Sequence, residues 1–205
     1  MRMEVPSQKQ TANLTKSDKM KDFKRYFVIA LAGLFLFPIS TSAQTLPLTS
    51  QPRGNNIISC SAYEAITYNG HTIDQINATE GNNNSVQSLW GTYSSVDEDE
   101  NVWEKVFIYN NNAVAFNTER SRLTVIEIKD NQWVIKVLGK EIRVGNSFSE
   151  LQQKFGSDLK IIYKPDINPN YAVSFNCSGN DFNGLLIDLS TETNKVVEIA
   201  YFKNP

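Results

Sequence analysis

The chain contains a single histidine, His71, so any imidazole chemistry rests on that residue. His71 follows the dipeptide Asn69-Gly70, which is typical of a tight turn. A zinc site needs further His or Cys ligands at short spacing, and the residues beside His71 include none. The sequence also lacks the G-x-S-x-G motif that often surrounds a nucleophilic serine. We therefore interpret His71 as a solvated turn residue, and we predict no catalytic residue.

An acidic run offers a second possible chemistry, because carboxylate and amide oxygens bind calcium. Asp97, Asp99 and Asn101 match positions 1, 3 and 5 of an EF-hand loop. Position 6 of that loop is a glycine and position 12 is a bidentate glutamate, but this chain has Val102 and Ile108 there. The EF-hand interpretation therefore fails, which leaves a solvated loop or a looser calcium site as alternatives. We predict no metal site and no cofactor.

Phosphate binding by a Gly-Lys pair and glycan hydrolysis by paired carboxylates are two further chemistries. Gly139-Lys140 is followed by Glu141, where a phosphate-binding P-loop requires serine or threonine. The two carboxylates of a glycosidase are defined by their separation in space, so sequence spacing does not identify them. A carboxylate-based hydrolase acting on glycans therefore remains an alternative to a protein without catalytic activity.

Cysteine and tryptophan residues supply the remaining candidate sites. An even cysteine count in an exported chain favours a disulfide between Cys60 and Cys177, and two buried free thiols are the alternative. Trp90 and Trp133 lie on segments with regular apolar spacing, so we expect them in the core. Trp103 follows the acidic run and is the candidate for a partner surface, since aromatic side chains anchor many protein interfaces.

Export is predicted by the segment 20–43, which has the three parts of a secretory signal peptide. Basic residues precede an apolar run, 26–37, that is shorter than the ~20 residues needed to span a bilayer. Small residues then stand where signal peptidase would cleave, so that the mature chain begins near Gln44. We interpret residues 1–19 as a non-native or extended leader and expect the true start at Met20.

The charge of the mature chain limits its partners. The first 43 residues hold seven Lys/Arg and three Asp/Glu, so the rest of the chain keeps 13 basic and 19 acidic residues and has a net charge of −6. An acidic surface repels phosphate backbones, so we expect no nucleic acid partner. The mature chain has no further long apolar run, and we predict no membrane span in it. We expect a secreted or periplasmic protein with a protein partner, and its oligomeric state stays open.

Three pairs of short segments match in the same order along the chain. The pairs are 69–73 with 138–142, 84–91 with 148–156, and 116–128 with 189–201. Such ordered self-similarity predicts a tandem duplication. We therefore divide the mature chain into an N-terminal linker over 44–60, a first unit over 61–131 and a second unit over 132–205.

Each unit is predicted to hold one short helix and several strands. Ser147 and Glu150 have the spacing of a capping box, and Leu151 and Phe155 follow on one helical face. In the first copy Asn82 takes the capping position. Segments rich in β-branched and aromatic residues, separated by turn formers, predict antiparallel strands. The predicted fold class is α+β, with two tandem units that each pack a short helix on an antiparallel β-meander.

The segment VGNSFSELQQKFG at 144–156, followed by strands, resembles the small bacterial envelope domains of the outer-membrane-assembly lipoprotein (SmpA/OmlA) type. Two such units in tandem, over roughly residues 66–202, resemble the β-lactamase-inhibitor-protein-like fold. The chain departs from the lipoprotein pattern, since no proline follows Gly91 or Gly156 and no cysteine stands at the cleavage point. The resemblance implies the architecture and an envelope location, but it carries over no substrate, partner or binding residue.

The combined expectation is an exported, non-catalytic binding protein of the cell envelope or extracellular space. The alternatives are the glycan hydrolase named above and a structural repeat module without a ligand. A contiguous apolar patch on the surface would favour a protein partner, and a deep cleft with facing carboxylates would favour an enzyme.

Overall fold

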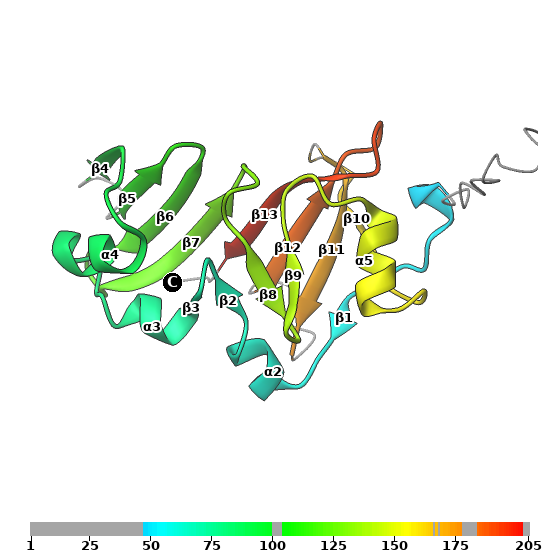
Figure 1. The fold of residues 1–205 in the computed structure, drawn as a ribbon, viewed down its shortest axis with the longest axis horizontal. Coiled ribbons are helices and arrows are strands. Elements are labelled where there is room, and N and C mark those ends of the chain that lie inside the picture. Colours follow the sequence, from blue (N-terminus) through cyan, green and yellow to red (C-terminus); the bar gives the residue numbers. More distant parts are fainter. Residues whose placement is uncertain (1–46, 100–103, 166, 168, 178–183, 203–205) are drawn as a thin grey trace, which may run out of the picture. The chain divides into compact units, whose positions relative to one another are not determined.

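A computed structural model describes residues 47–99, 104–165, 167, 169–177 and 184–202 (Figure 1). The predicted leader and signal peptide, Asn101 and Trp103 lie outside the described residues. The helices are η1 (Leu48–Ser50, a 3-10 helix), α2 (Cys60–Glu64), α3 (Ile73–Asn77), α4 (Asn83–Trp90) and α5 (Phe148–Phe155). The strands are β1 (Asn56–Ile57), β2 (Thr67–Tyr68), β3 (His71–Thr72), β4 (Ser95–Asp99), β5 (Glu104–Tyr109), β6 (Asn112–Asn117), β7 (Arg122–Ile128), β8 (Ile135–Val137), β9 (Lys140–Ile142), β10 (Ile162–Tyr163), β11 (Tyr171–Asn176), β12 (Gly184–Leu189) and β13 (Val196–Phe202).

The larger sheet joins two antiparallel meanders edge to edge. Across the part of the chain that the structure describes, its strand order is β1-β11-β12-β13-β7-β6-β5-β4, and β10 pairs with β11 as well. The meander β4 to β7 and the meander β10 to β13 meet where β13 pairs with β7 in antiparallel register. The short strand β1 is added in parallel to the end of β11, where Ile57 pairs with Asn176. Short helices with extensive antiparallel sheets confirm the predicted α+β class.

A smaller sheet has the order β3-β2-β8-β9 and is made of two hairpins. The first hairpin turns at Asn69-Gly70, with φ of 47° and 94°, and the second turns at Leu138-Gly139, with φ of 52° and 74°. Two successive positive φ angles are what a type I′ turn requires, and this turn matches the twist of paired strands. Gly139-Lys140 has the Gly-X composition of a tight hairpin turn, but the central residues of the turn lie one position earlier because Lys140 already belongs to β9.

Strand pairing between the two halves is compatible with tandem units. The alignment that places Gly70 on Gly139 also places Thr67 on Lys136, and these two residues pair at the centre of the small sheet. In the large sheet the matching alignment places Glu127 on Ala200, and these residues pair in the same way. A residue that pairs with its own counterpart is what a local twofold relation between the halves requires.

The two register shifts in the large sheet also lie at matching positions in the two halves. The β6–β7 ladder shifts register between Ala115 and Phe116, and the β12–β13 ladder shifts between Asp188 and Leu189. The alignment of Ile126 with Ile199 superposes these two bulges. The duplication itself stays a prediction, and the matching bulges, which short sequence matches do not reveal, are compatible with it.

Helices α4 and α5 form where the capping residues predict them. The Asn82 side chain accepts hydrogen bonds from the backbone of α4, and Ser147 forms a capping box with Glu150 at the start of α5. Gly91, with φ of 82°, follows the last residue of α4. The residues that end the two helices pack alike: the Trp90 ring lies 5.9 Å from Tyr109 of β5, and the Phe155 ring lies 5.2 Å from Phe175 of β11.

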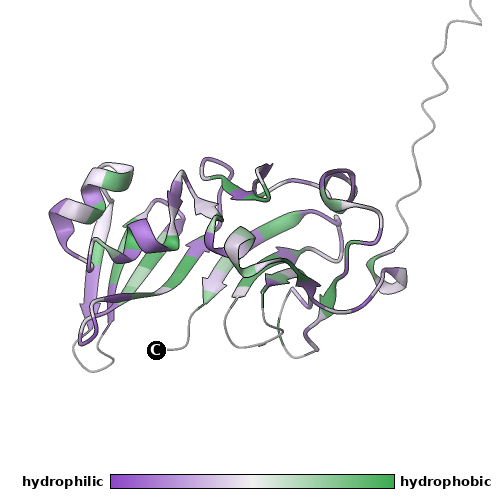
Figure 2. Cartoon of the chain, turned by 90° about the horizontal axis from the view of Figure 1, so that it is seen from below, coloured by the Kyte–Doolittle hydropathy of each residue, from purple (hydrophilic) through white to green (hydrophobic). Residues whose placement is uncertain are grey.

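The core lies on one face of the large sheet, beneath the helices and the small sheet (Figures 1 and 2). Alternate residues of each strand supply it, because successive side chains point to opposite faces. Its buried side chains from the large sheet include Phe107, Tyr109, Val114, Phe116, Leu123, Ile126, Ile128, Val173, Phe175, Leu185, Ile187 and Ile199. Ile66, Tyr68, Ile135 and Ile142 from the small sheet and its flank complete the opposite wall.

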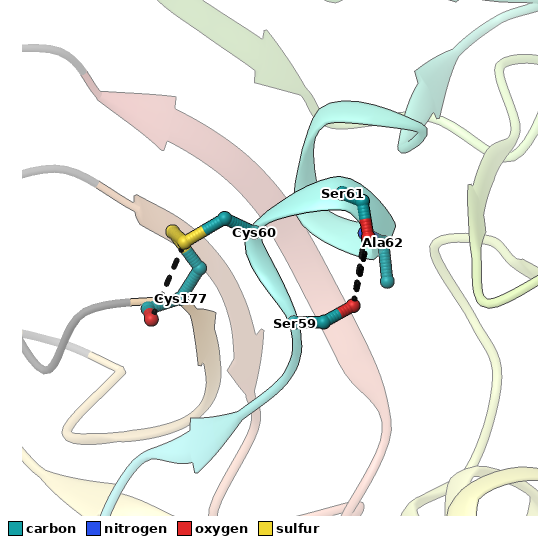
Figure 3. The surroundings of a disulfide bond; sticks show 5 residues. All are labelled: Ser59, Cys60, Ser61, Ala62 and Cys177. Carbon is teal, nitrogen blue, oxygen red and sulfur yellow. Dashed lines mark hydrogen bonds between the residues drawn. A yellow bond between two sulfur atoms is a disulfide. The ribbon is translucent and has the colours of Figure 1, made fainter.

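A disulfide between Cys60 and Cys177 fastens the N-terminal segment to the large sheet (Figure 3). It joins the first residue of α2 to the residue that follows β11, with the two Cα atoms 4.8 Å apart. The predicted pairing is therefore confirmed, although Cys177 lies just beyond the strand and is only half-buried. The segment 44–60, expected to be a linker, contains η1 and β1 where it is described.

Candidate functional site

His71 has a packing role instead of the solvated position that the sequence suggested. It lies on β3 and is half-buried. Its Nε2 atom is 3.0 Å from the carbonyl oxygen of Leu89, near the end of α4, and its ring meets the Trp90 ring edge-on at 5.8 Å. The expectation of a solvated turn residue was wrong because the turn ends at Gly70 and the next residue already pairs within the small sheet.

The acidic run lies on a strand where it is described. Asp97 and Asp99 belong to β4, the last strand at one edge of the large sheet, and the exposed Glu98 forms an ion pair with the half-buried Lys105 at 3.6 Å. Over the described residues, no group of three or more His, Cys, Asp or Glu side chains is placed to hold a metal ion. Those residues likewise include no helix that is long and apolar enough to cross a membrane.

The face of the large sheet opposite the core, here called the second face, carries apolar side chains at one end. Val106, Ala115, Val125 and Phe202 follow one another as cross-strand partners on β5, β6, β7 and β13. Paired residues on antiparallel strands share a face, so these four side chains form a continuous row. Val106 and Val125 are half-buried and Phe202 is 38% exposed, and none of the three belongs to the hydrophobic core.

A second, shorter row lies beside the first. Ile108 of β5 pairs with Ala113 of β6, and both are half-buried. Together the two rows make a patch that we call the apolar end of the second face. Its residues are Val106, Ile108, Ala113, Ala115, Val125 and Phe202.

The other end of the second face carries charged side chains, and we call it the charged end. Its residues are Glu127, Lys129, Lys164, Asp188 and Glu198. Asp188 and Glu198 are cross-strand partners on β12 and β13. The Lys164 ammonium lies 2.6 Å from the Asp188 carboxylate, and Lys129 lies 2.7 Å from Glu127 and 4.0 Å from Glu198.

Two of the three carboxylates at the charged end, those of Asp188 and Glu198, are partly withdrawn from water. Burial raises the pKa of Asp188, and the hydrogen bond from Lys164 opposes that rise. Burial is also the main cause of the raised pKa of Glu198. The side chains of Lys164 and Asp188 are only 12% and 11% exposed, so their ion pair is screened much less by salt than a surface pair. The Lys164–Asp188 pair is therefore held in place at the charged end, while the Lys129–Glu127 pair is more exposed to solvent.

The contrast between the two ends is not expected from the predicted duplication alone. The alignment that places Ile126 on Ile199 also places Val125 on Glu198 and Ala115 on Asp188. Equivalent positions are therefore apolar in one half and acidic in the other. Since the same sheet position accepts either residue type, the fold does not require this division of the second face.

Sequence reasoning named Trp103 as the candidate surface residue and missed the second face. The sequence did contain a signal for this face. In the segments EKVFIY, AVAF and LTVIEI, consecutive residues that point to opposite faces of a strand are both apolar. A strand with one solvated face alternates apolar and polar residues, so this departure marks strands with two apolar sides. It does not show which residues become neighbours across strands.

Comparisons with known proteins add little to this geometry. No protein-family model and no curated protein matches the chain. A solved structure with some similarity is an extracellular protein containing a SCP domain from Bacillus anthracis str. Ames, determined at 1.5 Å resolution. The two share 12% sequence identity with a TM-score of 0.36, and the match covers 60% of this chain and 43% of that protein, less than half of its length.

Proposed function

We propose that this chain is an exported, non-catalytic binding protein that contacts a protein partner through the second face of its large sheet. The observation that carries the proposal is the apolar end, a continuous cross-strand row on the second face in which Val106 and Val125 are half-buried, Phe202 is 38% exposed and the small Ala115 is buried between them. Contiguous apolar patches on soluble proteins commonly mark interaction sites, because leaving them in water is unfavourable. The face is opposite the helices, so a partner would reach it without displacing any of them.

The chemistry of the second face favours a protein over other partners. Protein interfaces combine an apolar centre with a polar or charged border, and the two ends of this face supply both. The charges of the charged end, among them the nearly buried Lys164–Asp188 pair, would set the register of a partner more than they would add affinity. A net charge of −6 for residues 44–205 disfavours a nucleic acid partner.

Glycan hydrolysis by the carboxylates of the charged end is less well supported. A general acid must reach its substrate, but Asp188 is 8% exposed and is ion-paired with Lys164. Its cross-strand partner Glu198 is itself within 4.0 Å of Lys129. These contacts suit fixed surface charges more than a proton donor.

An exported location is proposed on two grounds. The intramolecular disulfide is typical of proteins that mature in an oxidising compartment. Residues 20–43 have the composition of a signal peptide. N-terminal sequencing of protein recovered from the culture medium or periplasm is expected to start near Gln44. Recovery of the 23.1 kDa chain intact and embedded in membranes would contradict this location.

The binding proposal can be tested with one substitution on the second face. Val125→Glu places a charge within the apolar end, and the fold should accept it because Glu198 occupies the equivalent position of the other half. The control is Ile57→Glu, which adds the same charge at a residue that is 58% exposed on β1. Circular dichroism and thermal unfolding of both variants establish that each is folded.

Wild-type protein and both variants would be immobilised and exposed to envelope and culture-medium extracts of the source organism. We expect one extract protein to bind the wild type and Ile57→Glu, and to be lost with Val125→Glu. The affinity of that protein, once purified, should fall at least about tenfold with Val125→Glu, as for a charge buried in an interface. Equal capture by all three proteins would show that the second face is not the binding surface.

A further inference from the structure

Arg53 lies at the β10 edge of the large sheet, away from the apolar end of the second face. Its position is fixed by backbone hydrogen bonds on both sides of the residue. The Gly54 amide donates to the Ile161 carbonyl at 3.0 Å, and the Ile161 amide donates to the Pro52 carbonyl at 2.9 Å. Arg53 and Ile161 thus form an isolated parallel bridge immediately before β10.

The guanidinium of Arg53 is oriented by three further contacts. Its central carbon lies 4.9 Å from the ring centroid of Tyr171 and 5.9 Å from that of Tyr163. These two rings are cross-strand partners with centroids 5.2 Å apart. The Nη2 atom donates to the carbonyl of Thr49 at 3.3 Å. An arginine stacked on aromatic rings in this way loses less conformational entropy on binding a ligand than a free surface arginine.

The charge of this guanidinium is not neutralised by the described part of the chain, where no carboxylate lies within ion-pair distance of Arg53. It borders a hollow of about 500 Å³, a volume in the range of small-molecule sites. The hollow is lined by Arg53, Gly54, Ile161, Ile162, Tyr163 and Tyr171. Tyr163 is 51% exposed while Tyr171 and Ile161 are buried, so an aromatic and aliphatic wall stands beside a cation that has no ion pair among the described residues.

We propose that this hollow binds an organic carboxylate that carries a planar, apolar body. The planar fork of a guanidinium matches the two oxygens of a carboxylate, and the tyrosine rings and isoleucines would cover the apolar body. Two sources share this chemistry: a small aromatic acid, and the C-terminal carboxylate of a peptide that ends in an aromatic residue. The site goes beyond the proposed protein interface, because it uses other residues at another edge of the sheet.

Binding would be measured by NMR titration of the full mature chain with two matched pairs of probes. Benzoate and benzamide represent the small acid and its neutral analogue. N-acetyl-Gly-Gly-Phe with a free carboxylate and the same peptide with a C-terminal amide represent the peptide source. We expect the amide signals of Gly54 and Tyr163 to shift with at least one acid, and the matching neutral amide to bind at least about tenfold more weakly.

Three variants separate the proposed contacts from general effects. Arg53→Gln should weaken the acid at least about tenfold, and Tyr163→Ala should weaken it less, because stacking contributes less than the charged fork. The control Arg120→Gln makes the same charge change at an exposed turn residue between β6 and β7, where the backbone amide donates to the Asn117 side chain and is kept by the substitution. It should leave binding unchanged.

The outcomes are decisive in both directions. A response to benzoate alone assigns the site to small acids, and a response to the peptide acid alone assigns it to peptide C-termini. The proposal is overturned if neither acid binds at about 10 mM, well above the range of specific sites. It is equally overturned if acid and amide bind alike, or if Arg53→Gln binds as the wild type does. These results are independent of the Val125→Glu test, which concerns a different surface.

Discussion

At the scale of single residues, the ion pair of Lys164 and Asp188 is the clearest energetic feature of the second face. Lys164 leaves β10 and reaches over β11 to meet Asp188 on β12, 2.6 Å away. Removing two charges from water is costly, and the cost is recovered only while both partners are present. The pair should therefore be sensitive to the loss of one partner and tolerant of the loss of both.

Lys164→Met is expected to lower the free energy of unfolding by about 3 kcal/mol at pH 7, because it leaves the Asp188 carboxylate buried without its cation. The double variant Lys164→Met/Asp188→Leu should recover most of that loss. Urea denaturation followed by circular dichroism measures both effects. The control is Lys136→Met, whose ion pair with Glu141 is exposed (side chains 49% and 49%) and should change stability by less than about 1 kcal/mol.

The Lys164→Met loss should also depend on pH with a defined sign. Burial already raises the pKa of Asp188, and removal of Lys164 takes away the group that opposes the rise. A carboxyl group whose pKa is higher in the folded than in the unfolded chain binds its proton more tightly when folded, so stability is gained as the pH falls through that pKa. The loss should therefore shrink on acidification from pH 7. A loss that stays constant would argue against an ionised, unpaired Asp188.

At the scale of elements, the two helices owe their ends to local side-chain contacts. The Ser147 hydroxyl accepts from the Glu150 amide at 3.2 Å, and the Glu150 carboxylate accepts from the Ser147 amide in return. That backbone hydrogen bond is the largest cause of the lowered pKa of Glu150. A capping box of this kind satisfies amides that would otherwise lack partners at the helix start.

Ser147→Ala is expected to cost about 1 kcal/mol of folding free energy, because an amide of α5 loses its cap. The pKa of Glu150, followed by NMR titration, should also rise part of the way toward the ordinary glutamate range, because the Ser147 hydroxyl no longer donates to the carboxylate while the backbone amide of residue 147 still does. Ser157→Ala, at an exposed residue just after the helix, serves as the control and should change neither quantity. An unchanged pKa in Ser147→Ala would show that the Ser147 hydroxyl does not donate to the Glu150 carboxylate in solution.

The aromatic residues that end the two helices give a second prediction at this scale. Trp90 and Phe155 are half-buried against the core, each beside an aromatic ring of its own meander. We expect Trp90→Ala and Phe155→Ala to cost about 2–4 kcal/mol each, somewhat below the range for fully buried aromatic side chains. Phe202→Ala, on the second face and outside the core, should cost about 1 kcal/mol or less. A large loss for Phe202→Ala would mean that the second face is already packed in the free protein.

At the scale of the whole molecule, the N-terminal segment completes the large sheet. Asn56 links two parts of it, since its side-chain amide donates to the carbonyls of Lys160 and Ser174 at 2.9 and 3.0 Å. β1 then pairs with the end of β11 that β10 leaves uncovered. Just after these paired residues, Cys60 and Cys177 form the disulfide. The segment therefore protects a strand edge that would otherwise be open to pairing with another chain.

Replacement of both cysteines by alanine is expected to lower the free energy of unfolding by about 4 kcal/mol, since the bridge closes a loop with a sequence separation of 117 residues. Hydrogen exchange at Ile57 and Ile58 should accelerate more than exchange in β6, because β1 loses its tether. A reducing agent should produce the same change in the wild type and none in the double variant. Equal denaturation midpoints for the two proteins would contradict a stabilising bridge.

Features set by neighbouring residues could be predicted from the sequence alone. The helix starts at Asn82 and Ser147, the glycines that end both helices, the tight hairpin near Gly139 and the α+β class all follow from local chemistry. Capping and turn formation involve residues within a few positions of one another, so their signals survive in a short stretch of sequence. The disulfide was also predictable, because the chain has two cysteines and carries a predicted signal peptide.

Features that depend on residues far apart in the chain were decided by the tertiary structure. Three contacts join distant segments: β7 pairs with β13, β1 adds in parallel to β11, and the His71 ring meets the Trp90 ring edge-on. The second face and the Arg53 hollow arise from the same long-range pairing, because their residues become neighbours only when strands take a particular order and register. Strand register depends on which partners bury which face, and that choice is made by the whole core at once.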